Sequence, residues 1–211
     1  FAHGSFNIAN TLIQLPFIGA WAYLVTKLIP GEDTLIEYKP KHLDEALIAQ
    51  SPSIALGQAK QEVVRMGEFS VQGLQETLKF LQTGDEKHAN LTTQLEEAIN
   101  VLDEKTTDYL VALSKLSLSN NDSQVHHALL DSIRDIERIG DHFENLVELI
   151  NFKGNNRVRL SEEAMDELVE MVELTVDTVS LSVKASDQRS EEVAHEAIVT
   201  EDKIEDRNTV G

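Results

Sequence analysis

Four carboxylates follow one another along one predicted helix in the middle of the chain. Glu137, Asp141, Glu144 and Glu148 are separated by steps of four, three and four residues, which places them on one line of a helix surface. Like charges at these spacings cost roughly a few tenths of a kcal/mol per pair unless water, an arginine or a cation relieves them. Oxygen ligands without cysteine favour Mg, Mn or Ca over a structural Zn site. The line therefore predicts a divalent-cation site.

Glu137 and Asp141 are the central ligands of this predicted site, because they lie one turn apart and can both reach a single ion. Glu97 and Glu68, on neighbouring predicted helices, are the candidate further ligands. The alternative is a solvated acidic face, since 37 Asp and Glu against 18 Lys and Arg give acidic faces by arithmetic. Two carboxylates alone bind weakly, so partial or empty occupancy is expected.

Other chemistry finds no support in the residue pattern. The chain contains no nucleophile elbow, glycine-rich phosphate loop or dinucleotide fingerprint, so it is predicted not to be an enzyme. It has no cysteine, which excludes disulfides and thiolate metal sites. The formal net charge of −19 argues against binding to nucleic acid and is compatible with cations and basic partner surfaces.

Helices must position these carboxylates. From about residue 53 onward apolar residues recur at steps of three and four, without an alternating strand pattern. Each predicted helix carries the narrow apolar stripe of an antiparallel bundle. Turn and cap residues separate the helices, and Ser161 before two glutamates suits a helix start. The predicted helices cover residues 54–82, 89–117, 124–151 and 162–184, with a fifth beginning at about residue 191.

One stretch of the sequence occurs twice, 105 positions apart. MGEFSVQGL at 66–74 aligns with MVELTVDTV at 171–179, and Glu-Glu-Ala-Ile at 96–99 falls on Glu-Asp-Lys-Ile at 201–204. This offset predicts that a three-helix unit is used twice. Because the first copy runs to about residue 150, the second is expected to run to about 255 and is predicted to be incomplete.

The longest apolar tract is residues 8–29, which contains one charge, Lys27. Its length is about what is needed to cross ~30 Å of hydrocarbon, so it predicts a membrane-type helix. The alternative is a buried amphipathic helix broken at Pro16. Lys27, Lys39 and Lys41 favour a cytoplasmic location for the chain that follows the tract.

The segment Asp135-Ile-Glu-Arg-Ile-Gly-Asp-His-Phe-Glu-Asn145 resembles the L-E-R-I-G-D-H signature of PhoU-like proteins, with Ile136 where leucine is usual. The resemblance implies a bundle of two three-helix repeats. It also implies that Glu137 and Asp141 contribute to multinuclear metal clusters on the bundle surface, which admits Fe and, with less support, Zn.

A second resemblance lies near the start of the chain. His3-Gly-Ser-Phe-Asn7, followed by Leu15-Pro-Phe17, is similar to the last membrane segment of the bacterial sodium/phosphate cotransporter family. Members of that family often carry a PhoU-like domain after the transport core. The resemblance implies a transport-related role for His3, Phe6 and Asn7, and simple helix packing is the alternative.

The predicted fold is an all-α antiparallel helical bundle from a duplicated three-helix PhoU-like unit. Its second repeat is incomplete, and an apolar membrane-type helix precedes it. Four parts are expected: 1–30, the end of the last transmembrane segment; 31–52, a linker; 53–151, repeat one; and 152–211, the truncated repeat two.

The resemblance implies that the chain is the regulatory domain of a sodium-dependent phosphate transporter whose intact form carries out sodium:phosphate symport. The expected partners are the membrane through residues 8–29, the transport core, sodium and phosphate, while self-association into a homo-oligomer stays open. The implied location is the cell membrane, as a multi-pass protein with residues 31–211 in the cytoplasm. The alternative is a soluble PhoU-type regulator of phosphate uptake or signalling that binds a partner protein and metal.

Overall fold

Helices make up nearly all of the chain that the computed structural model describes, which is Phe17, residues 36–188 and residues 190–208. No strand occurs in these ranges, so the all-α prediction is confirmed for them. The helices are α3 (Glu45–Gln50), α4 (Pro52–Thr83), α5 (Glu86–Ser114), α6 (Asn120–Asn155), α7 (Glu162–Gln188) and α8 (Glu191–Asn208).

Local chemistry explains where the long helices begin and end. Gly84 ends α4 in the left-handed conformation, with φ 68°, and its N–H donates to Phe80 O. Asp85 then caps α5 by accepting a hydrogen bond from the Lys87 amide. The Ser119 side chain caps α6 in the same way. These turns are short, so consecutive helices run in opposite directions.

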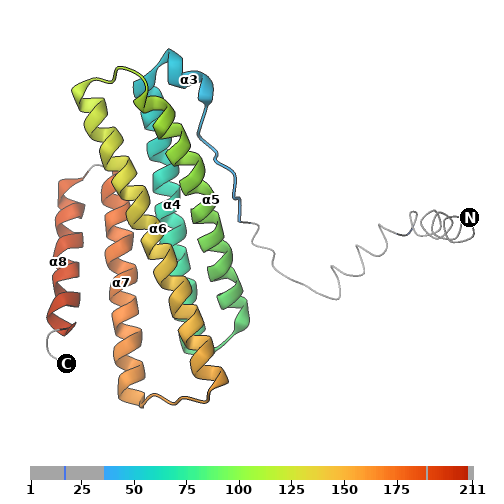
Figure 1. Ribbon diagram of the computed structural model, residues 1–211. Helices are drawn as coiled ribbons and strands as arrows, with labels where there is room; N and C mark the ends of the chain where they lie inside the picture. Colours follow the sequence, from blue (N-terminus) through green and yellow to red (C-terminus); the bar gives the residue numbers. More distant parts are fainter. Residues whose placement is uncertain (1–16, 18–35, 189, 209–211) are drawn as a thin grey trace, which may run out of the picture. The chain divides into compact units, whose positions relative to one another are not determined.

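The helices α4, α5 and α6 pack around one continuous apolar core. Figure 1 shows α4 and α6 running in the same direction, with α5 antiparallel to both. Burial of each large aliphatic side chain contributes roughly 1.5–3 kcal/mol. Buried core residues from the three helices include Leu56, Met66, Leu74, Ile99, Leu102, Leu110, Leu129, Ile133 and Phe143.

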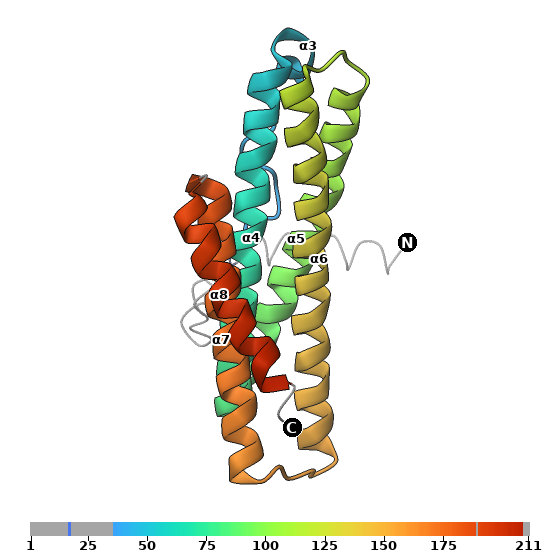
Figure 2. The same ribbon diagram turned by 90° about the vertical axis from the view of Figure 1, so that its left-hand side faces the viewer.

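The helix α7 lies along α4, and α8 packs against α7 (Figures 1 and 2). Lys60 Nζ of α4 donates to Asp187 O near the end of α7 at 2.9 Å, so the two helices are antiparallel. Val176 of α7 joins the core cluster of α4, α5 and α6. Because α4 and α7 carry the two similar segments, their pairing is compatible with a duplicated unit, but the duplication itself stays a prediction.

The short helix α3 lies within residues 31–52, which were predicted to be a linker. The division into residues 1–30, 31–52, 53–151 and 152–211 stays a prediction. By its contacts the chain divides between Leu35 and Ile36.

Among the described residues, no helix is both long and apolar enough to cross a bilayer. The predicted location, a multi-pass protein of the cell membrane, is contradicted by this finding. Apart from Phe17, the tract 8–29 that motivated it lies outside the described residues, as do His3, Phe6 and Asn7.

Candidate functional site

The predicted metal ligands of α6 lie on its border with α5. Glu137 is half-buried, and its pKa is raised by burial, then by the negative charges of Asp141 and Asp103, although Arg138 acts in the opposite sense. Asp141 is one turn further along α6, as its spacing predicted, whereas Asp103 belongs to α5. The two helices therefore bring carboxylates of the same charge towards one another.

The α5–α6 border also holds a more deeply buried carboxylate, which belongs to α5. Glu96 of α5 is 9% exposed and accepts a hydrogen bond from Asn100 Nδ2. Burial, and after it the charge of Glu144, raises the pKa of Glu96, and Asp141 and Glu97 add to the effect. The α5–α6 border is thus an acidic strip in which the ionised carboxylates repel one another.

The two further ligands proposed from sequence lie differently. Glu97 is exposed on α5, where its charge and hydrogen bond, after burial, raise the pKa of Tyr38. Glu68 is exposed on α4. Within the described ranges no group of three or more acidic or histidine side chains is arranged to hold a metal ion. The assignment of Glu137, Asp141, Glu97 and Glu68 as metal ligands therefore stays a prediction.

Sequence reasoning did not select Glu96 and Asp103, the α5 residues that face the α6 line. A signal for them exists, because they are seven residues apart and so lie on one side of α5. Their pairing with α6 depends on the register between two antiparallel helices. That register is set by packing, such as the approach of Ile99 to Gly140.

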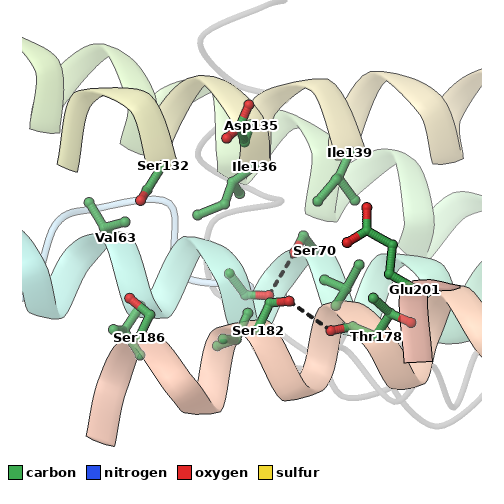
Figure 3. A pocket seen from close by; sticks show the side chains of 14 residues that line it. Val63, Ser70, Ser132, Asp135, Ile136, Ile139, Thr178, Ser182, Ser186 and Glu201 are labelled. Carbon is green, nitrogen blue, oxygen red and sulfur yellow. Dashed lines mark hydrogen bonds between the residues drawn. The ribbon is translucent and has the colours of Figure 1, made fainter. Parts of the chain in front are cut away.

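A groove of about 420 Å³ lies between α6 and α7 (Figure 3), with α4 as its floor. Gly67 and two valines of α4 lie at its base, and valines and isoleucines share the α6 and α7 sides with serines and a threonine. Glu201 of α8 lies at its edge, and Asp135 lines the α6 side.

Four of the five hydroxyl groups that line this groove are occupied by their own helices. Ser70, Ser132, Thr178 and Ser182 each donate to a main-chain carbonyl three or four residues earlier, at 2.7–2.9 Å. No Lys, Arg or His is among the described residues that line the groove. Anion binding normally uses such cations or free donors, so this groove does not suit phosphate.

Comparison with known proteins finds a family match to the part of the chain that forms α4, α5 and α6. The PhoU domain model matches residues 63–150, which cover most of α4, all of α5 and most of α6. The chain is 26% identical over 183 residues to the "Putative inorganic phosphate export protein YjbB" of Salmonella typhimurium, and this match covers 86% of the chain. The protein of that name from Escherichia coli K12 is 26% identical over 145 residues, or 68% of the chain.

A shorter match is to the "Phosphate-specific transport system accessory protein PhoU homolog" of Xylella fastidiosa Temecula1, which is 30% identical over 101 residues, or 48% of the chain. The matches span 33%, 26% and 42% of the lengths of these three relatives. No solved structure matches the chain significantly.

These matches support the PhoU-like part of the sequence-based resemblance and leave its sodium-dependent part without support. They name an accessory protein of a transport system and indicate no catalytic family.

Proposed function

We propose that residues 36–208 form a PhoU-like regulatory module that controls phosphate movement by contacting a phosphate transport protein. The observation that carries this proposal is the coincidence of the PhoU match with the α4–α6 bundle. Relatives named for phosphate export and for a phosphate transport system support phosphate as the regulated cargo.

The geometry favours protein contact over direct binding of phosphate. The α6–α7 groove offers no cationic side chain among its described lining residues, and the net charge of −19 repels anions. A transport protein can be contacted whether it belongs to the same polypeptide or to another one. Coupling of its transport to sodium is a finer proposal, which only the resemblance around His3, Phe6 and Asn7 supports.

The test is an in-frame deletion of the codons for residues 36–208 in the native gene. Radiolabelled phosphate uptake and release are then measured after growth in high and low phosphate. We expect the phosphate flux to lose its dependence on the growth condition. A control strain carries an unrelated three-helix bundle of the same length in place of the module. Fluxes that adjust normally in the deletion strain would contradict the proposal, and replacing sodium by potassium tests the sodium coupling.

We also propose that the α5–α6 acidic strip binds a divalent cation through Glu137 and Asp141, with Glu97 and Glu68 as the further ligands predicted from sequence. The raised pKa of Glu137 supports this proposal, because a cation would relieve the repulsion that contributes to the shift. Oxygen ligands suit Mg, Mn, Ca or Fe better than Zn.

Titration with Mn²⁺, with the heat of binding measured by calorimetry, tests the site. Glu137→Gln/Asp141→Asn should bind Mn²⁺ at least about tenfold more weakly than the wild type. The matched control is Glu173→Gln/Asp177→Asn, which removes the same residue types at the same spacing from an exposed face of α7. Equal binding by all three proteins would show that the strip is a solvated acidic face. Single Glu97→Gln, Glu68→Gln and Glu96→Gln variants then identify the further ligands.

A further inference from the structure

Two charged side chains of α4 are buried beneath residues 37–42, the segment that leads into α3. Glu62 has 0% and Arg65 7% of its surface exposed. The two residues lie one turn apart, and Arg65 Nη1 donates to Glu62 Oε2 at 3.1 Å. Because desolvation of a buried ion pair can exceed its Coulombic gain, further hydrogen bonds must satisfy both groups.

Arg65 also donates hydrogen bonds to two main-chain carbonyls. Nη1 donates to Lys39 O at 2.8 Å, and Nη2 donates to Glu37 O. These two carbonyls are two residues apart, so one planar guanidinium spans both. The guanidinium also lies over the ring of Phe69, 5.1 Å from its centroid, which supports its orientation.

Glu62 recognises the amides that follow. Its Oε1 accepts hydrogen bonds from the backbone N–H of Lys41 at 2.5 Å and of His42 at 2.6 Å. His42 adds one side-chain contact, from Nδ1 at 2.9 Å. With this exception, the hydrogen bonds that join the pair to residues 37–42 all involve main-chain atoms of that segment.

Other contacts of this segment are weaker. Glu37 and Lys41 form an exposed ion pair within the segment, and exposed pairs of this kind add little stability. The Tyr38 side chain interacts with Glu97 of α5, whose charge and hydrogen bond, after burial, raise the pKa of Tyr38. The α4 pair is therefore the main buried attachment of residues 37–42 to the bundle.

We propose that Glu62 and Arg65 form a peptide-backbone clamp that holds residues 37–42 as a releasable strap. Opening of the clamp frees the chain ahead of α3 while α4–α6 stay folded. The clamp binds main-chain carbonyls and amides, so its ligand class is a peptide backbone, and residues 37–42 of the same chain occupy it. This proposal does not depend on the regulatory function proposed above.

Limited trypsin digestion of the full chain tests the clamp, because Lys41 lies in the strap, is exposed and is followed by His42. Arg65→Met keeps most of the side-chain volume and removes its hydrogen bonds to the strap. Mass spectrometry should show cleavage after Lys41 at least about tenfold faster than in the wild type, with α4–α6 remaining uncut. Unchanged cleavage after Lys41 would overturn the proposal.

Glu76→Gln is the matched control, because Glu76 is also a buried α4 carboxylate but binds Lys79 and His88 instead of the strap. Faster strap cleavage in this variant would show a general loss of stability and count against the clamp. If Arg65→Met does not fold, amide exchange in the wild type decides. The Lys41 and His42 amides should exchange at least about tenfold faster than the α4 core amides. If the strap amides and the α4 core amides exchanged only when the whole protein unfolds, release of the strap would be refuted.

Discussion

Thr106 of α5 is fully buried, and its hydroxyl oxygen has no hydrogen-bond partner among the described residues. Valine has nearly the same shape and no polar group to leave unsatisfied. We expect Thr106→Val to raise the free energy of unfolding by about 1 kcal/mol, measured by urea denaturation. The control is Thr77→Val, which loses the bond from Thr77 Oγ1 to Gly73 O at 2.8 Å and should be less stable than the wild type. A destabilised Thr106→Val protein would mean that the hydroxyl is satisfied.

The stability of the protein should depend on pH through Glu96, a residue of the acidic strip. Because burial and the charge of Glu144 raise its pKa, the folded state holds this proton at higher pH than the unfolded chain does. The stabilising contribution is fully present below the unfolded-state pKa and is lost as pH rises through the folded-state pKa. Glu96→Gln should therefore have a higher Tm than the wild type at neutral pH. The gain should shrink as pH falls to about 4.

Glu76 gives the opposite sign and serves as the comparison for this pH series. Burial, the largest single effect, acts to raise its pKa, but hydrogen bonds and charges of Lys79 and His88 outweigh it and lower the pKa. Its contribution is present above the unfolded-state pKa and is lost as pH falls through the folded-state pKa. Glu76→Gln should thus be less stable at neutral pH. Equal pH profiles for the two variants would contradict both assignments.

At the scale of the helices, the contact of α4 with α6 depends on a missing side chain. A Cβ at Gly73 would lie 2.5 Å from Cζ of Phe143, whose ring is fully buried. Gly73→Ala should lower the free energy of unfolding by about 1–3 kcal/mol, since overpacking outweighs the gain in helix propensity. Gly57→Ala, which meets nothing within 4 Å on the same helix, should instead gain about 0.5–1 kcal/mol. Urea midpoints of the two variants on the same side of the wild type would contradict this prediction.

The long helices could be predicted from sequence because each repeats its apolar stripe over many turns. For example, the stripe predicted over residues 54–82 corresponds to α4, Pro52–Thr83. Helix α3 has six residues and buries none of them, so periodicity gave no signal. The one-turn spacing of Glu137 and Asp141 was likewise evident in sequence. The approach of Glu96 and the main-chain clamp of Arg65 were not, because both depend on contacts between elements far apart in the sequence.

Over the whole molecule, the formal net charge is −19, so the excess carboxylates repel one another. Raising NaCl from about 0.01 M to about 0.15 M shortens the screening length from about 30 Å to about 8 Å, so the Tm should rise. Differential scanning calorimetry measures the shift. MgCl₂ at equal ionic strength separates screening from specific binding, because a bound cation adds its own increase. A Tm that falls with NaCl would show that attractive ion pairs outweigh the repulsion.

The central position of α4 also has a kinetic consequence. Pairing within α4–α6 joins neighbouring helices through short turns, whereas α7 meets α4 only after about a hundred intervening residues, and local contacts form faster. Ile99→Val, in the α5–α6 contact, should slow refolding. Val176→Ala, on α7, should mainly speed unfolding and leave the refolding rate nearly unchanged. Stopped-flow refolding and unfolding rates measure both effects. If Val176→Ala slowed refolding as much, α7 would belong to the folding nucleus; otherwise it docks on a transition state that α4, α5 and α6 have already built.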